Sequence, residues 1–548
     1  MEISGNTFSL AGHFFLPEDG RFFKGVMEVK EGMIISLIQQ EDVPERYYFP
    51  GLVDAHVHIE SSMLVPAEFA RAAVVHGTVA TVSDPHEIAN VLGKEGVEFM
   101  IRNGATTPFR FYFGAPSCVP ATPLETSGAV LDENDILELL QREDIVYLAE
   151  MMNFPGVIFD DPQVQAKLEY ARRLGKPIDG HAPGLQGEQL KKYIGAGIST
   201  DHECFTLEEA REKAALGMKI LIREGSAARN FETLIPLLRE MPHMVMFCSD
   251  DKHPDDLERG HINLLIQRGL ALGYPLGDLI RACTLNPVTH YGLDCGLLRP
   301  GDPADFTEVD HPDRFNILTT YIHGICVARN GKCLFETRSA MTPNRFDPAP
   351  LTARDLQIPA KTDTVQVIGA MNGQLVTQQL VRKLPVSEGL LQTDTGADVI
   401  KLVVVNRYQP APPAVAFIHG FGLKAGALAG TVAHDSHNII LAGTDDHWIL
   451  RAFEAICNSG GGLVLTGPDG ILSLPLPVGG IMSDLPLAEV SAKYAALDRK
   501  AKELGCTLSA PFMTLSFMAL LVIPELKLGD KGLFDGNTFR FTDLFVYQ

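Results

Sequence analysis

Two histidines stand one residue apart in the segment Asp54-Ala55-His56-Val57-His58, directly after a short apolar run. Side chains on a β-strand alternate between its two faces, so His56 and His58 point to the same side. Two imidazoles on one side of a strand end can chelate a single transition-metal ion. The pair alone would equally suit two unrelated surface histidines, so the prediction of a metal site depends on further ligands elsewhere in the chain.

Residues of the types that bind metals also end four other apolar runs. These residues are Glu150, His181, His202 and Asp250. Imidazole and carboxylate ligands together suit iron, manganese or zinc better than calcium or copper(I). Four histidines and two carboxylates at five strand ends therefore predict two divalent transition-metal ions. Manganese or iron(II) is the first expectation for their identity, and zinc is the alternative.

The elements that must position these residues alternate regularly from Pro50 onward. Eight short apolar runs are separated by amphipathic, helix-like stretches. The predicted strands are 51–56, 78–83, 110–115, 145–150, 178–181, 197–202, 218–223 and 244–250. Such alternation predicts an α/β fold of the (β/α)8 TIM-barrel type, although a doubly wound open sheet could give a similar count. A barrel would gather the strand ends at one mouth, where barrel enzymes hold their active sites.

The rest of the chain predicts three further parts. Residues 1–49 and 295–340 consist of short apolar runs and turns, and together they predict a small β domain that flanks the barrel of residues 50–294. Residues 341–361 are rich in Pro, Thr and Asp and predict a linker. Residues 362–548 mix strand and helix patterns and predict a C-terminal α+β domain.

This constellation of ligands resembles the signature of the amidohydrolase superfamily. That signature has His-x-His on strand one, a bridging residue on strand four, histidines on strands five and six, and an aspartate on strand eight. Many members bridge their metals with a carboxylated lysine, and the matching position here is Glu150. Within the superfamily the chain resembles the adenine deaminase family. The segments that carry this closer resemblance are 50–64, 83–90, 180–184, 201–203, 249–254, 284–287, 420–424, 434–438 and 513–517.

The resemblance implies hydrolysis of adenine to hypoxanthine and ammonia, a reaction of purine salvage, by attack of a metal-bridging hydroxide on C6. The implied metal ligands are His56, His58, Glu150, His181, His202 and Asp250. Asp250 is the candidate to carry the proton of the hydroxide to the leaving amine, with Asp251 as the alternative. Glu203 is a candidate proton donor to the ring, although a solvated acid at a helix start would explain it as well.

A second polar cluster, Asp84, His86 and Glu87, follows the second predicted strand. Its place after a strand puts it on the same mouth, where it could read the edge of the purine or bind an extra metal ion. The same residue types also fit the N-cap and first turn of a helix. Residues 434–437 allow a lid or a second metal site, and a hydrogen-bonded turn is the alternative interpretation.

Composition narrows the expected partners and location. The 548 residues include 46 Lys plus Arg and 68 Asp plus Glu, a formal net charge of −22. An acidic surface repels nucleic acids and anionic membranes. Nine cysteines without a C-x-x-C pair indicate free thiols in a reducing compartment. Since the start of the chain lacks a signal-peptide pattern, we expect a cytoplasmic enzyme with a small-molecule substrate, assembled as a homodimer.

Two other functions remain open from the sequence. A cyclic-amide hydrolase of the dihydroorotase or hydantoinase kind would use the same metals, and Arg223 or Arg229 could then hold the carboxylate of its substrate. A scaffold protein that had lost its metals would show eroded ligands, whereas all six positions are filled here. Ammonia release from adenine, compared with ring opening of hydantoins, would separate the two enzymes.

Overall fold

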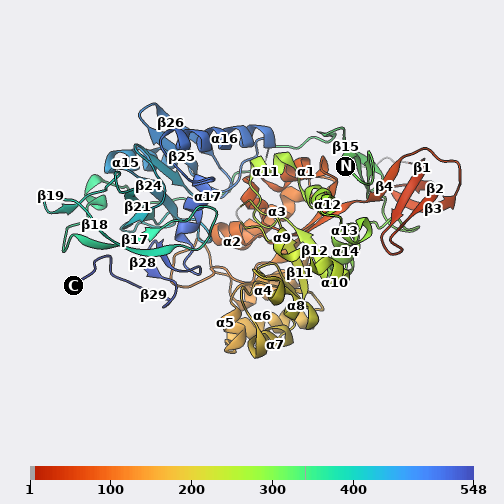
Figure 1. Ribbon diagram of the computed structural model, residues 1–548, viewed down its shortest axis with the longest axis horizontal. Coiled ribbons are helices and arrows are strands. Elements are labelled where there is room, and N and C mark those ends of the chain that lie inside the picture. The colour runs from red at the N-terminus through yellow and green to blue at the C-terminus, as the bar shows by residue number, and fades with distance from the viewer. Residues whose placement is uncertain (1–6, 227, 340, 548) are drawn as a thin grey trace. The chain divides into compact units, whose positions relative to one another are not determined.

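The computed structural model describes residues 7–226, 228–339 and 341–547 (Figure 1). The chain divides into two compact units. The first unit comprises Met1–Pro85, Glu98–Cys118 and Asp132–Ser339, and the second comprises His86–Val97, Val119–Leu131 and Ala340–Gln548. Among the described residues, no helix combines the length and the apolar content that crossing a lipid bilayer requires. All nine cysteines are free thiols.

Eight parallel strands form a barrel in the first unit. They are β5 (Leu52–Val57), β6 (Thr78–Ser83), β7 (Arg110–Ala115), β8 (Ile145–Met151), β9 (Ile178–Gly180), β10 (Thr200–Asp201), β11 (Lys219–Arg223) and β12 (Val245–Cys248). The amide of Ser199 donates to the carbonyl of Ile178 at 2.9 Å, which joins β9 to the segment of β10. The amide of Asp250 donates to the carbonyl of His56 at 2.9 Å, which joins the last strand to the first. The predicted (β/α)8 fold is therefore confirmed, and the open sheet is excluded.

Side chains at the helix starts decide where several barrel helices begin. The carboxylate of Asp161 accepts the amides of Gln163 and Val164 at 3.0 and 3.1 Å at the start of α6 (Pro162–Arg173). The hydroxyl of Thr206 accepts the amide of Glu209 at 3.2 Å at the start of α8 (Leu207–Ala215). These bonds satisfy amides that have no partner inside the helix. Other helices of this unit include α1 (Pro66–Val74), α4 (Glu133–Leu140), α7 (Gly187–Gly195), α9 (Phe231–Leu234), α10 (Leu237–Glu240), α12 (Ile262–Ala271), α13 (Leu276–Ala282) and α14 (Leu285–Tyr291).

Alternation along β11 separates the apolar core from the interior of the barrel. Ile220 and Ile222 are fully buried in the core cluster that includes Phe231 of α9. Because neighbouring side chains on a strand point to opposite faces, Leu221 and Arg223 point away from these helices and into the barrel. The same strand therefore supplies packing on one face and a charged group to the barrel interior on the other.

A separate eight-stranded sheet joins the two ends of the first unit. Its order is β16 (Lys332–Cys333), β15 (Ile325–Arg329), β14 (Ile317–Ile322), β13 (Phe306–Val309), β4 (Tyr47–Pro50), β1 (Phe8–Leu16), β2 (Arg21–Lys30) and β3 (Met33–Gln39). The strands β4 and β13 pair antiparallel, and Arg46 donates to Glu308 at 2.7 and 2.8 Å beside this pairing. The sheet supports the prediction that residues 1–49 and 295–340 build one β domain, whose boundaries stay a prediction.

The second unit contains a large mixed sheet. Its order is β18 (Gln378–Lys383), β17 (Thr364–Gly369), β22 (Ala414–His419), β21 (Val399–Val405), β24 (Ile439–Gly443), β23 (Ala427–Gly430), β25 (Gly462–Gly467) and β26 (Gly470–Pro475). The helix α15 (Asp446–Ser459) lies beside this sheet (Figure 1). Its Ile449 and Ile456 belong to a core shared with strands of the sheet. Residues 341–361, predicted as a linker, belong to this unit, and Leu356 is fully buried in its core.

A partly buried histidine in α14 predicts that the fold loses stability in acid. Burial lowers the pKa of His290 from 6.5 to about 4, and its Nε2 lies 3.2 Å from the hydroxyl of Ser199. The folded state therefore favours the neutral ring, whereas the unfolded chain binds a proton as the pH falls below 6.5. Between pH 6.5 and 4 this residue alone should lower the free energy of unfolding by about 3 kcal/mol.

The measurement is urea unfolding of His290→Gln followed by circular dichroism at pH 7 and pH 4.5. The variant should lose less stability on acidification than the wild type. His311→Gln is the control, because the side chain of His311 is 42% exposed. Equal acid sensitivity in wild type and His290→Gln would contradict the expectation.

Candidate metal centre

The six side chains predicted as metal ligands converge at the C-terminal ends of the barrel strands. His56 and His58 stand at the end of β5, Glu150 on β8, and Asp250 after β12. His181 follows β9 and His202 follows β10. All six belong to the first unit, and all except His181 are nearly inaccessible to solvent.

Three of these residues form the first ligand group. The Nε2 atoms of His56 and His58 lie 3.2 Å apart. Oδ1 of Asp250 lies 3.3 Å from Nε2 of His58 and 3.7 Å from Nε2 of His56. Ligand atoms bound about 2.1 Å from one metal ion are spaced by roughly 3 Å or more, so these distances fit a common ion.

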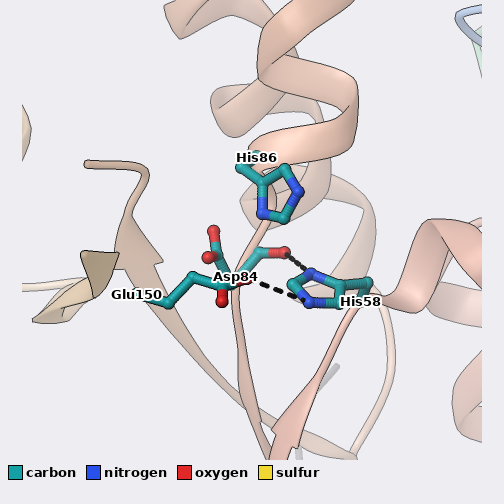
Figure 2. A group of neighbouring side chains, drawn as sticks. All are labelled: His58, Asp84, His86 and Glu150. Carbon is teal, nitrogen blue, oxygen red and sulfur yellow. Dashed lines mark hydrogen bonds and ion pairs between the residues drawn. The ribbon is translucent and has the colours of Figure 1, made fainter. Parts of the chain in front are cut away.

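Glu150 lies between this group and a second pair of imidazoles, those of His181 and His202. Its Oε1 lies 3.3 Å from Nε2 of His58. Its Oε2 lies 2.7 Å from Nδ1 of His181 and 3.4 Å from Nε2 of His202. Figure 2 shows the side chains of His58 and Glu150 pointing toward each other. One carboxylate thus offers a separate oxygen to each pair of histidines, which is the arrangement of a bridging ligand.

A main-chain carbonyl fixes which nitrogen of His58 faces the other ligands. Nδ1 of His58 lies 3.1 Å from the carbonyl oxygen of Asp84 (Figure 2). A carbonyl can only accept, so Nδ1 donates its hydrogen to it, and Nε2 is the nitrogen that faces Glu150 and Asp250. Metal-binding histidines are commonly oriented in this way. The main chain of Asp84 therefore orients a predicted metal ligand.

The electrostatics of the site suit cations. Burial, with help from neighbouring imidazoles, lowers the pKa of His56 to about 3 and that of His202 to about 4. Both rings therefore stay neutral and keep a lone pair at ordinary pH. Burial opposes ionisation of Glu150, but the charge of His181 and hydrogen bonds from the histidines hold the pKa of this carboxyl well below its usual range. Burial opposes protonation of His181, but the carboxylates of Glu203 and Glu150 raise its pKa to about 9. Imidazoles and ionised carboxylates together are a donor set that fits divalent transition metals.

Asp250 and Asp251, which the sequence left as alternatives for the proton shuttle, face different partners. Asp250 has a left-handed backbone with φ of +53°, and its carboxylate faces the first ligand group. Asp251 accepts a hydrogen bond from the hydroxyl of Ser61 at 2.5 Å. The geometry therefore supports Asp250 as the shuttle.

Glu203 lies beside the second pair of histidines rather than in solvent. Its side chain is buried, and its Oε1 lies 3.8 Å from Nδ1 of His181 and 3.6 Å from Nε2 of His202. Nη2 of Arg223 donates to its Oε2 at 2.9 Å. The interpretation of Glu203 as a solvated acid at a helix start is therefore wrong.

Two sets of supporting residues were not predicted from the sequence. In the first, the carboxylate of Asp54 accepts the amide of Ser249 at 2.9 Å and lies 2.9 Å from Nε2 of His261. These contacts tie the end of β5 to the end of β12, the two segments that carry the first ligand group. The only signal in the sequence was the position of Asp54 in the Asp-x-His-x-His motif.

The second set is a fully buried ion-pair network around Lys213 of α8. Its Nζ donates to the carbonyl of Ala182 at 2.7 Å, to Glu209 at 2.6 Å, and to Asp201. Asp201 also accepts the amide of Ala182 at 3.3 Å. The network therefore fixes the segments that follow β9 and β10, which carry the second pair of histidines. Lys213 lies inside a helical pattern, so nothing in its local sequence distinguishes it from a surface lysine.

Lys213→Met should lower the free energy of unfolding by about 3–5 kcal/mol, because it leaves two buried carboxylates without their cation. We also expect a lower metal content, since the second pair of histidines loses its support. Chemical unfolding and metal analysis by mass spectrometry measure the two effects. Lys191→Met is the matched control, because Lys191 pairs with Glu188 at the surface, where ion pairs contribute less than about 1 kcal/mol. Similar losses in both variants would contradict the role assigned to Lys213.

His86 and Glu87 begin α2 (His86–Leu92), which belongs to the second unit. There Oε1 of Glu87 accepts a hydrogen bond from Nδ1 of His434 at 2.5 Å, and Oε2 accepts one from Nε2 of His437. Nδ1 of His437 accepts the amide of Ala433 at 3.2 Å, so Nε2 is the nitrogen that carries the hydrogen. A protonated Nε2 donates to a carboxylate and has no lone pair for a metal. Residues 434–437 thus fit the predicted hydrogen-bonded turn better than a second metal site.

Comparisons with known proteins cover both units. The amidohydrolase family model matches residues 47–332, and the model of the adenine deaminase C-terminal domain matches residues 374–540. An adenine deaminase of Salinibacter ruber is 52% identical, over 98% of this chain and 99% of that protein. An adenine deaminase of Methanosarcina mazei is 54% identical, over 96% and 97%. A third, of Borreliella afzelii, is 42% identical, over 98% and 100%.

Proposed function

Because the chain belongs to the adenine deaminase family of amidohydrolases, we propose that it hydrolyses adenine to hypoxanthine and ammonia at the mouth of the barrel. The observation that carries this proposal is the position of Glu150, with one oxygen toward His58 and the other toward His181 and His202. A carboxylate placed between two groups of metal ligands suits a reaction in which water is activated for attack on a ring carbon.

The amidohydrolase match implies dependence on divalent metal ions. His56, His58 and Asp250 would hold one ion, His181 and His202 the other, and Glu150 would lie between them. We propose manganese or iron(II), with zinc as the alternative, because imidazole and carboxylate ligands suit these metals. When bound, such ions supply Lewis acidity that makes water a nucleophile near neutral pH.

The side chains of the protein would move the protons of the reaction. Asp250, whose Oδ1 faces the histidines, takes a proton from the attacking water and gives it to the exocyclic amine, which leaves C6 as ammonia. Glu203, beside His181 and His202, gives a proton to ring nitrogen N1 as water adds to C6. It takes back the proton of the new C6 hydroxyl when the C–N bond breaks, so that C6=O forms and both carboxyl groups return to their starting states. Proton transfer by a positioned side chain typically contributes ~10²–10⁴-fold to the rate.

The alternative function, a cyclic-amide hydrolase, would need Arg223 or Arg229 to bind the carboxylate of its substrate, and the contacts of both arginines argue against it. Arg223 already donates to Glu203 and Asp250. The half-exposed Arg229 donates to the carbonyl of Gly225 at 2.9 Å and to Asp256 at 3.2 Å. Both guanidinium groups are therefore engaged with the protein itself rather than available to a substrate carboxylate.

The test is a direct comparison of substrates with protein loaded with manganese. We expect ammonia and hypoxanthine in equal amounts from adenine, and no ring opening of hydantoin or dihydroorotate. Protein treated with a chelator is the control and should regain activity when the metal is restored. Ring opening without ammonia release would reject the proposal. The homodimer and the cytoplasmic location expected from the sequence stay predictions, and light scattering on the purified protein tests the dimer.

A further inference from the structure

A buried arginine stands between the two carboxylates to which the proposed function assigns proton transfer. Arg223 ends β11 and points into the barrel, and only 5% of it is exposed. Its Nη1 donates to Oδ2 of Asp250 at 2.8 Å and also to Oε1 of Glu203. Its Nη2 donates to Oε2 of Glu203 at 2.9 Å. One guanidinium therefore holds Glu203 at two points and Asp250 at one.

These contacts determine which oxygen of Asp250 faces the histidines. Because Oδ2 is held by Arg223, Oδ1 is the atom that lies 3.3 Å from Nε2 of His58. The planar fork of a guanidinium matches the plane of a carboxylate, so it fixes orientation as well as position. Removing the fork would remove the three hydrogen bonds from Arg223 that orient these two carboxylates.

The hydrogen bonding of Arg223 is concentrated on the two carboxylates, and its Nε is left over. Within the described part of the chain, the buried Nε of Arg223 has no hydrogen-bond partner. Burial of an incompletely paired arginine is costly and calls for an explanation. The hydrogen bonds that this guanidinium does make run from Nη1 and Nη2 to the carboxylates of Glu203 and Asp250.

We propose that Arg223 is a positioning residue for the deamination, an inference that rests on the proposed function. It holds Asp250 and Glu203 on two sides of the imidazole cluster, so that each presents a defined oxygen to the purine. A misplacement of about 1 Å in a reacting group can cost ~10²-fold in rate, so this placement matters for turnover. Arg223 itself exchanges no proton with the substrate.

Arg223→Lys tests the proposal, because lysine keeps the positive charge and loses the fork. We expect kcat to fall at least ~100-fold while KM changes less than threefold and the variant keeps the metal content of the wild type. If charge neutralisation were the only role, kcat of Arg223→Lys would stay within threefold of the wild type, which would overturn the proposal. Loss of metal from this variant would overturn it as well, since Arg223 would then act through metal retention.

Chemical rescue provides a second measurement. Arg223→Ala should regain at least tenfold in kcat when methylguanidinium is added, whereas methylammonium, which has the same charge and a different shape, should not restore it. Equal rescue by both cations would overturn the proposal. Arg229→Lys is the matched control, because Arg229 contacts neither Asp250 nor Glu203, and its kcat should stay within twofold of the wild type.

A spectroscopic comparison separates this proposal from the proposed function. The visible absorption of protein loaded with Co²⁺ depends on the ligands around the ion and needs no substrate. We expect the bands to shift in Arg223→Lys and to remain unchanged in Arg229→Lys. Failure of the deaminase proposal would appear as a wild type that releases no ammonia from adenine. Failure of the positioning proposal would appear as identical Co²⁺ spectra in wild type and Arg223→Lys.

Discussion

Glu150→Gln should bind less than one metal ion per chain and should lose ~10³-fold or more in kcat. The substitution keeps the shape of the side chain and removes its charge. It also replaces one carboxylate oxygen with an amide NH₂, which donates hydrogen bonds and cannot bind a cation. Because Oε1 and Oε2 face different pairs of histidines, either orientation of the amide leaves one pair facing a donor. Metal analysis and the adenine assay on the same preparation measure both effects.

His58→Ala is the companion variant, because it removes a ligand from the first group alone. It should also abolish measurable turnover and lower the metal content. Glu188→Gln on the surface of α7 is the control, since the side chain of Glu188 is 88% exposed and pairs with Lys191 at the surface. Near-normal rates in both Glu150→Gln and His58→Ala would falsify the site assignment.

Asp250→Asn should lower kcat by ~10²–10⁴-fold, the usual contribution of a positioned proton shuttle. Asparagine can still accept a hydrogen bond from Arg223 but cannot take a proton from water. Binding of hypoxanthine should persist, which would show that the loss lies in chemistry rather than in the shape of the site. Calorimetry of hypoxanthine binding, together with kcat, checks the prediction.

Asp251→Asn is the matched variant for this second prediction. Its carboxylate accepts a hydrogen bond from Ser61 rather than facing the histidines, so we expect less than a tenfold fall in kcat. A larger loss in Asp251→Asn than in Asp250→Asn would reverse the assignment of the shuttle. The pair of variants therefore decides a question that two adjacent aspartates left open in the sequence.

The fold could be predicted from the sequence because its signals are local and repeated. Each barrel strand is a short apolar run of the kind seen at 78–83, and the structure has β6 at Thr78–Ser83. The strand at 197–202 was less well bounded, since β10 covers only Thr200–Asp201. The strand β10 lies at the edge of the three-stranded part of the barrel, β10–β12, next to the five-stranded part, β5–β9. How many of its residues pair depends on neighbouring strands, which a local pattern does not specify.

The sequence by itself determined which residues stand at the ends of the barrel strands. His56 and His58 share a side because of the two-residue period of a strand, and Glu150 and Asp250 follow apolar runs that a barrel must gather at one mouth. Only the tertiary structure decided what each polar group contacts. Arg223 faces Glu203 and Asp250, and Lys213 lies buried against Asp201, because packing turned these helices and strands in particular directions. The sequence pattern of a strand or helix specifies the face on which a side chain lies. Its partner across the barrel is a residue distant in sequence, and the distance between the two is set only when the barrel has folded.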